Sequence, residues 1–180
     1  MPEAVLEDVQ VNRSIVRLIK ADITELEVDA FVFYAQPDLA LGSGFGGAIS
    51  VRGGPSIQKE LDELGPLDTG QAVVSAAGKL NASHIVHAVG PRFNEADIEG
   101  KLRTTVANSL KAAEEVGVKR IALPAMGAGF YGVPLDLCAR VTLDAIKSYL
   151  EGETEIQEVI ICVIDRREFT PFEARLASLN

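Results

Sequence analysis

Apolar residues along the chain gather in short runs that predict strands, with longer amphipathic stretches between them. The run 14–20 alternates apolar and charged residues, which is typical of a strand near a sheet edge with one solvated face. The later runs are short and continuously apolar, as expected for strands covered on both faces. These later runs span residues 30–35, 72–75, 84–89, 120–123 and 159–164.

Between these runs, apolar positions recur with helical spacing. The stretch 97–116 carries Leu102, Val106 and Leu110 on one face and is followed by Gly117, a residue typical of helix ends. Another helix is predicted to have Pro134 as its first position, where a missing N–H costs nothing. The remaining predicted helices cover about residues 47–66 and 168–179, and the one that starts at the proline ends near residue 152.

Alternating strands and helices predict an α/β fold in which a mostly parallel, mixed sheet lies between two helical layers. The 180 residues suffice for one domain with a single core, and no repeat or change of composition marks a linker. The predicted domain covers residues 14–180. Residues 1–13 are predicted to be an N-terminal extension that is either loose or covers a sheet edge.

Two glycine-rich segments, residues 41–47 and 126–132, each follow a predicted strand and precede a predicted helix. Loops at the carboxyl ends of parallel strands bring backbone N–H groups and helix N-termini around an anion, and glycine permits close approach of the ligand. Small residues that merely allow a tight turn are an equally good account of either segment alone. Their repetition at matching points favours a ligand with two phosphates.

The formal net charge of −9 opposes extensive contact with nucleic acid, because phosphate backbones require a basic stripe and none is visible. Backbone amides can still hold a small anion. No apolar stretch reaches about eighteen residues, and the first residues lack the basic flank of a signal peptide. We therefore expect a cytoplasmic protein that binds neither nucleic acid nor membranes.

Cysteine and histidine positions argue against a metal site. Cys138 lies in a predicted helix and Cys162 in a predicted strand, so both are expected to be small buried residues and not a disulfide or metal pair. His84 and His87 are three apart in a strand and therefore point to opposite faces. No metal and no cofactor are expected.

Five motifs, in this order along the chain, resemble those of the macro domain family, which is an ADP-ribose-binding, Appr-1-p processing-like family. The resemblance runs from about Ser14 to the C-terminus. The resemblance implies a three-layer α/β/α fold that binds ADP-ribose, a related NAD-derived metabolite or a mono-ADP-ribosyl group on a protein. The motifs are Ala21-Asp22-Ile23-Thr24, residues 28–32, Gly47-Ala48-Ile49, residues 87–91 and residues 124–134.

By position, Asp22 resembles the family's acidic residue that accepts a hydrogen bond from the adenine amino group, and Ile23 would pack beside that ring. Asp22 also suits a helix N-cap ahead of Thr24, and both roles can hold at once. Phe169 resembles an aromatic residue near adenine, although a core position on an amphipathic helix explains it equally well.

The two glycine segments then correspond to loops that hold the diphosphate and the riboses, with Phe130 and Tyr131 packed against the distal ribose. The predicted ligand-binding residues are Asp22, Ile23, Gln36, Gly42, Ser43, Gly44, Phe45, Gly46, Gly47, Gly127, Ala128, Gly129, Phe130, Tyr131 and Phe169.

The chain departs from the family's hydrolytic members. Their two asparagine positions and one acidic position are occupied here by Phe33, Gln36 and Gly46, none of which can act as a general base. The catalytic residues are therefore unknown, and binding is the first interpretation. Substrate-assisted hydrolysis of ADP-ribose derivatives, by deacylation or removal of a mono-ADP-ribosyl group, is the alternative. Bulk at Phe33, Tyr34 and Phe45 is expected to narrow the distal-ribose end. A third interpretation, a fold used only for protein contacts, therefore stays open.

Overall fold

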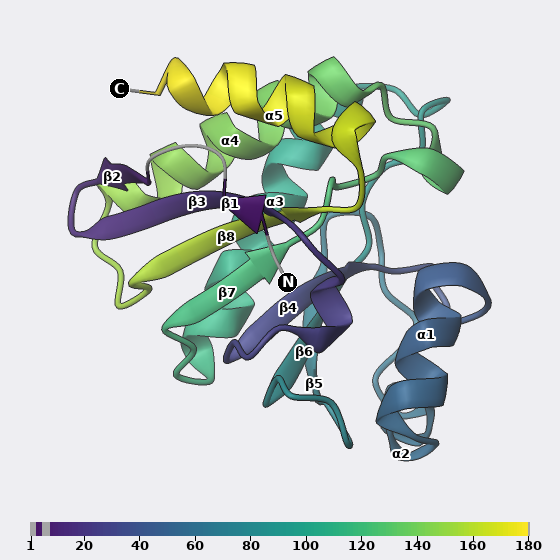
Figure 1. The fold of residues 1–180 in the computed structure, drawn as a ribbon. Coiled ribbons are helices and arrows are strands. Elements are labelled where there is room, and N and C mark those ends of the chain that lie inside the picture. Colours follow the sequence, from purple (N-terminus) through teal and green to yellow (C-terminus); the bar gives the residue numbers. More distant parts are fainter. Residues whose placement is uncertain (1–2, 5–7, 180) are drawn as a thin grey trace.

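A mixed sheet with helices on both faces forms the molecule (Figure 1). The computed structural model describes residues 3–4 and 8–179, apart from the side chains of residues 3, 4 and 130. Eight strands within these residues join one sheet. They are β1 (Glu3–Ala4), β2 (Val9–Val11), β3 (Ser14–Lys20), β4 (Ala30–Tyr34), β5 (Ala72–Ala76), β6 (His84–Ala88), β7 (Arg120–Leu123) and β8 (Glu158–Val163).

The sheet has the order β1-β3-β8-β7-β4-β6-β5, and β2 also pairs with β3. Its central strands, from β3 to β6, run parallel, whereas β5 is antiparallel to β6 and both β1 and β2 are antiparallel to β3. The predicted mostly parallel mixed sheet is therefore confirmed. One expectation is wrong: residues 72–74 are only half-buried, because β5 is an edge strand and the described helices cover it incompletely.

The described strands of residues 1–13, β1 and β2, pair with β3 on the side away from β8. Val9 lies opposite Val16 in the ladder, and both Val9 and Val11 are buried. The remaining residues of that segment, 1–2 and 5–7, lie outside the described residues. Residues 9–11 thus cover a sheet edge, and the domain boundary at residue 14 stays a prediction.

The helices are α1 (Gly44–Gly53), α2 (Ser56–Asp62), α3 (Ile98–Glu115), α4 (Leu135–Glu151) and α5 (Arg166–Ala177), with short 3₁₀ turns η1 (Ile23–Glu25) and η2 (Gly129–Tyr131). The single helix predicted over residues 47–66 is wrong. It begins earlier, inside the glycine segment, and is divided at Gly54, where φ is +93°, and Pro55, which has no N–H to continue the ladder. Pro134 is the N-cap of α4 and not its first helical residue.

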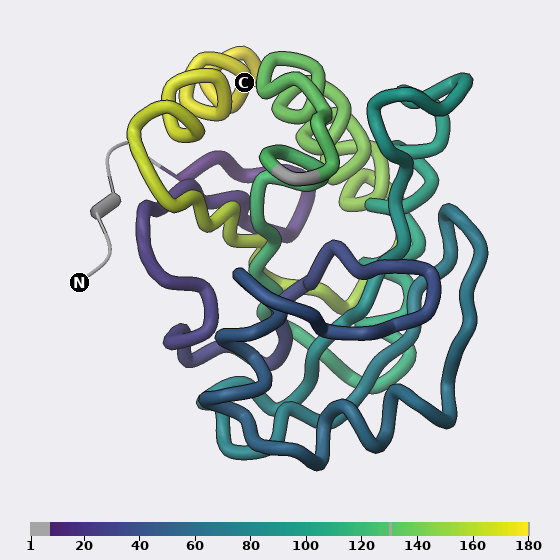
Figure 2. The backbone as a smooth tube through the Cα atoms, turned by 90° about the vertical axis from the view of Figure 1, so that its right-hand side faces the viewer, coloured from purple at the N-terminus to yellow at the C-terminus, as the bar shows by residue number. Residues whose placement is uncertain are grey.

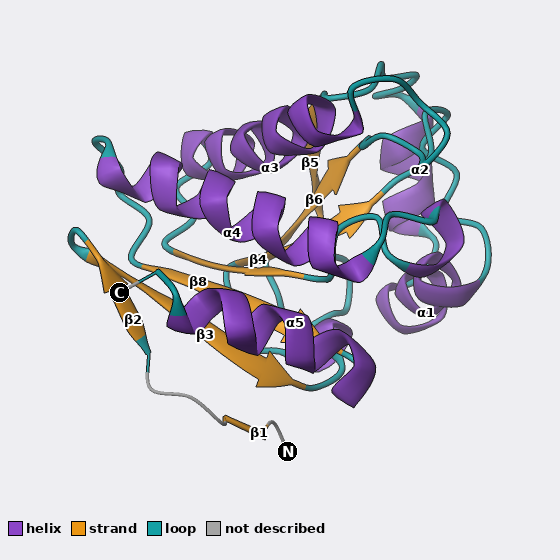
Figure 3. Cartoon of the chain, turned by 90° about the horizontal axis from the view of Figure 1, so that it is seen from above, coloured by secondary structure: helices purple, strands orange, loops and turns teal. Residues whose placement is uncertain are grey.

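Two apolar layers hold the helices to the sheet. Along β4, Val32 and Tyr34 face the layer formed with α3, α4 and α5, while Phe31 and Phe33 face the layer formed with α1 and α2. Helices α3, α4 and α5 lie side by side in the same layer (Figure 3). This arrangement confirms the three-layer α/β/α architecture.

The carboxyl ends of the parallel strands meet at one end of the sheet, which faces the reader in Figure 2. Both glycine-rich segments leave the sheet there, the first after β4 and the second after β7. In α/β sheets this end is where ligands bind, because loops and helix N-termini converge on it.

A buried histidine lies in β6. The side chain of His87 is fully buried; its Nε2 lies 2.8 Å from Ser75 Oγ, and its Nδ1 has no hydrogen-bond partner among the described residues. His84, at the start of the same strand, is half-buried. Burial disfavours the charged imidazolium and lowers the pKa of His87 to about 4.

We expect the free energy of unfolding to fall as the pH drops from about 6.5 to about 4. In this window the unfolded chain's histidine binds a proton that His87 in the fold does not take up, so the loss reaches about 3 kcal/mol and then levels off. Chemical denaturation across this pH range measures it. His87→Gln should flatten the curve and His84→Gln should not; equal pH dependence in both variants would contradict the assignment.

Candidate functional site

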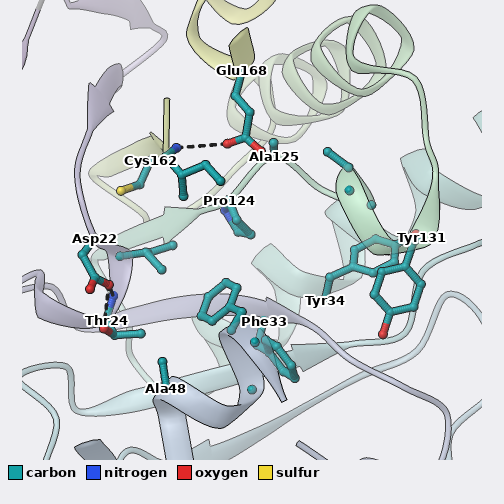
Figure 4. A pocket seen from close by; sticks show the side chains of 18 of the residues that line it. Asp22, Thr24, Phe33, Tyr34, Ala48, Pro124, Ala125, Tyr131, Cys162 and Glu168 are labelled. Carbon is teal, nitrogen blue, oxygen red and sulfur yellow. Dashed lines mark hydrogen bonds between the residues drawn. The ribbon is translucent and has the colours of Figure 1, made fainter. Parts of the chain in front are cut away.

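A pocket of about 740 Å³ opens at the carboxyl ends of β4, β7 and β8. Asp22, Thr24 and Cys162 lie toward one end of it, and Tyr34 and Tyr131 lie at the other (Figure 4). The lining residues are Ala21, Asp22, Ile23, Thr24, Phe33, Tyr34, Gln36, Leu41, Ser43, Gly44, Phe45, Gly46, Ala48, Pro124, Ala125, Gly127, Ala128, Gly129, Tyr131, Cys162, Ile164, Arg167 and Glu168.

The first glycine segment is held from outside the pocket by helix α2. Gln58 Oε1 accepts a hydrogen bond of 2.9 Å from Leu41 N, and Gln58 Nε2 donates to Leu39 O at 3.3 Å. Gly46 packs directly against the Leu41 carbonyl, since a Cβ at Gly46 would lie 1.7 Å from that oxygen. Only glycine permits this approach, which determines where α1 begins.

The N-terminus of α1 is uncapped at the pocket. Ser43 is its N-cap residue but makes no side-chain cap hydrogen bond, and Gly44, Phe45 and Gly46 of the first turn line the cavity. The first N–H groups of a helix have no intrahelical partner, and the helix dipole adds partial positive charge there. This turn is therefore suited to hold an anion.

The second glycine segment brings another uncapped turn to the same cavity. η2 begins at Gly129 after Ala128, which provides no side-chain cap. Gly127 has φ of +81°, and a Cβ there would lie 2.6 Å from a methyl group of Val133, so the loop needs glycine for its backbone and for its packing. The two segments face one cavity with backbone amides from both.

Aromatic rings form the end of the pocket near η2. The rings of Tyr34 and Tyr131 lie 4.7 Å apart, and the Arg92 guanidinium is 5.9 Å from the centre of the Tyr131 ring. The Tyr34 hydroxyl donates to the backbone oxygen of Pro91, and burial raises the pKa of this phenol further above its usual value. Tyr34 therefore stays neutral and supports Tyr131.

Phe33 and Phe45 give the wall between these loops an apolar surface. Their rings pack edge to face, with centroids 5.0 Å apart. Both residues line the pocket, together with Tyr34. The expected bulk of these three side chains is thus at the cavity wall. Of the three, Phe33 occupies a position where the resemblance places an asparagine in hydrolytic relatives.

Asp22 lies at the opposite end and is held by three hydrogen bonds. Its Oδ1 accepts from Thr24 N at 3.0 Å and Thr24 Oγ1 at 2.6 Å, and its Oδ2 accepts from Arg52 Nη1 at 2.5 Å. Burial opposes the charge, but the bonds from Thr24 and Arg52 outweigh it and hold the pKa of Asp22 below its usual value. The carboxylate caps η1 and lines the pocket, and 41% of the Asp22 side chain is exposed.

Cys162 and Glu168 also line the pocket. The Cys162 thiol donates to Ala21 O at 3.4 Å, and burial raises its pKa to about 12, which favours the protonated thiol at neutral pH. Glu168 accepts a hydrogen bond of 3.0 Å from Ile164 N, and burial raises its pKa above the usual value. Asp165 caps α5 by accepting from Glu168 N, which fixes Glu168 at the wall.

Most predicted ligand-binding residues meet in the pocket, and three do not. Gly42 and Gly47 are outside the lining, because Gly42 lies at the exposed outer turn and Gly47 faces the Gly42 carbonyl. Phe169 is only 2% exposed and packs into the core from α5, as the explanation of a core position on an amphipathic helix requires. The backbone of Phe130 belongs to η2, but its side chain lies outside the described residues.

Sequence reasoning missed the part of the lining that α5 and the ends of β7 and β8 contribute. Pro124, Ala125 and Ile164 follow those strands directly, so their position after a parallel strand was the available signal. For Glu168 the signal was the spacing Asp165-x-x-Glu168, a capping-box pattern right after a strand.

Among the described residues, no group of three or more His, Cys, Asp and Glu side chains is placed to hold a metal ion. None of the described helices combines the length and apolar character that a membrane span requires.

A model of the macro domain family matches residues 34–142. This chain belongs to the macro domain family. A protein of Saccharolobus solfataricus is 40% identical over 168 residues, covering 90% of this chain and 92% of its own. A macro domain-containing protein of Caldanaerobacter subterraneus is 37% identical over 171 residues, covering 92% of this chain and 97% of its own.

Solved macrodomains share the same fold. A mutant macrodomain of Oceanobacillus iheyensis with ADPR superimposes with a TM-score of 0.91 at 25% identity, covering 96% of this chain and 97% of its own. A Trypanosoma brucei macrodomain in complex with ADP-ribose gives a TM-score of 0.83 at 25% identity, covering 88% of this chain and 68% of its own.

Gly46→Ala should disrupt the first loop, because its Cβ cannot fit beside the Leu41 carbonyl. We expect a loss of about 1–3 kcal/mol in the free energy of unfolding. Gly47→Ala is the matched control: its Cβ would be 3.5 Å from the nearest atom, and replacing glycine inside a helix favours stability by roughly 0.5–1 kcal/mol. Denaturant unfolding of both variants measures this; a Gly46→Ala variant as stable as Gly47→Ala would contradict the packing argument.

Proposed function

We propose that this macro domain binds ADP-ribose, free or as a mono-ADP-ribosyl group on a protein, in the cytoplasm. The observation that carries the proposal is the pair of uncapped helical N-termini, those of α1 and η2, at one cavity. Two such termini match the two phosphates of a diphosphate. The macrodomain structures with ADPR and ADP-ribose support the same ligand.

The proposed orientation follows the chemistry of the two pocket ends. The carboxylate of Asp22 suits the amino group of adenine, a hydrogen-bond donor, with Ile23 beside the ring. The diphosphate then lies between Gly44–Gly46 and Gly127–Gly129. The distal ribose points toward Tyr131 and the wall formed by Phe33 and Phe45.

We propose binding without hydrolysis, because the described lining offers no side-chain base near the distal ribose. Gln36 cannot take a proton at neutral pH, and the raised pKa of Tyr34 keeps its hydroxyl neutral. A carboxylate at Gly46 has no space beside the Leu41 carbonyl. Asp22 is at the other end of the cavity, and the carboxylate of Glu168 already accepts a hydrogen bond from Ile164 N.

Calorimetric titration with ADP-ribose, with AMP as the control, tests the proposal. We expect ADP-ribose to bind in the micromolar range and AMP, which has one phosphate, to bind more weakly. The cell contents are then incubated with an acylated ADP-ribose and analysed for products. Absence of ADP-ribose binding would refute the function, and turnover would refute binding without hydrolysis.

Asp22→Ala should weaken ADP-ribose binding by about 1–3 kcal/mol, because the adenine amino group loses its acceptor. Asp8→Ala is the matched control, since Asp8 also accepts from an arginine, Arg17 at 2.7 Å, and does not line the pocket. Calorimetry of the two variants gives the comparison. Equal affinity of the Asp22 and Asp8 variants would remove the adenine assignment.

A further inference from the structure

The side chain of Arg52 reaches the base end of the pocket without lining it. Arg52 lies in the last turn of α1, and its Nη1 donates to Asp22 Oδ2 and to Thr24 Oγ1, both at 2.5 Å. The Thr24 hydroxyl in turn donates to Asp22 Oδ1. These three side chains form a closed ring of hydrogen bonds in which Thr24 is buried and Arg52 is the outermost member.

The ring leaves one acceptor position on Asp22. An ionised carboxylate offers about four lone-pair positions. In the structure, Oδ1 accepts two hydrogen bonds from Thr24, and Oδ2 accepts one from Arg52. The second lone pair of Oδ2 is therefore the position open to a donor in the pocket. Arg52 donates its hydrogen bond to this same oxygen, Oδ2.

Helix α1 also connects this oxygen to the other ligand contact. Its first turn lines the pocket where the anion is expected, and Arg52 lies eight residues later, about 12 Å along the axis. Glu25 lies 3.7 Å from the same guanidinium, which draws Arg52 toward η1. One short helix thus spans the distance between the proposed diphosphate and base positions.

We propose that Arg52 is the positioning residue for base selection: by holding Asp22 Oδ2, it orients the remaining lone pair toward a base that presents an amino group. This inference rests on the proposed function, since it concerns the same pocket. A base with a carbonyl in place of that amino group offers an acceptor to an acceptor and should be rejected. Without Arg52, Asp22 keeps only the two hydrogen bonds from Thr24 to Oδ1, so Oδ2 is held less firmly and the rejection weakens.

The test measures base selectivity in four proteins: the original chain, Arg52→Gln, Arg52→Lys and Arg140→Gln. Arg140 is the matched control, because it is 44% exposed like Arg52 and pairs with Glu99 away from the pocket. Each protein is titrated with ADP-ribose and with its hypoxanthine analogue, and thermal unfolding of each is recorded. The readout is the ratio of the two affinities, which a general loss of stability does not change.

We expect the original chain to prefer ADP-ribose by roughly ten-fold. Arg52→Gln should lower that ratio by about three-fold or more, Arg52→Lys should restore part of it, and Arg140→Gln should leave it unchanged. An unchanged ratio in Arg52→Gln, with ADP-ribose still bound by the original chain, overturns the role of Arg52 alone. Failure of the original chain to bind ADP-ribose overturns the proposed function instead.

Discussion

The contact between Gly46 and the Leu41 carbonyl is the constraint on which the pocket depends. Because no Cβ intervenes, the chain turns directly from β4 into α1, and the helix begins at the cavity with its first N–H groups uncapped. A larger residue would displace the first turn from the strand ends. The close packing of Gly46 on the Leu41 carbonyl thus determines the position of the proposed anion site. It also determines the position of Arg52, eight residues after the start of α1 at Gly44, and its contact with Asp22.

The same contact explains why the site favours recognition. Where hydrolytic relatives are expected to place a carboxylate, this chain has backbone packed against backbone, and the adjoining wall is made of Phe33 and Phe45. Two carboxylates line the pocket elsewhere: Asp22 caps η1, and Glu168 is held by the cap that Asp165 provides. In the proposed orientation, the pocket thus combines amides for an anion, an acceptor for a base and an apolar distal wall.

Much of this was available from the sequence. The spacing of apolar residues predicted every central strand, since buried parallel strands have short apolar runs. The alternation of strands and helices predicted a sheet between two helical layers, and the glycine-rich segments marked both loops. The division of one predicted helix at Gly54 and Pro55 was also available from the sequence, because a Gly-Pro pair well inside a predicted helix signals a break, but the prediction did not use it. Phe169 and Glu168 adjoin in sequence, and only the rotation of α5 decides which one faces the cavity. The pairing of Arg52 with Asp22 depends on tertiary structure across thirty residues.

The central claim is that backbone amides of two separate loops bind one ligand. Amide proton and nitrogen chemical shifts of the isotope-labelled protein, recorded while ADP-ribose is added, test it most directly. The account predicts that the largest changes occur together at residues 44–46 and 127–129, with smaller ones at Asp22 and Ile23. Changes confined to one loop, or to the exposed edge of β5, would contradict it.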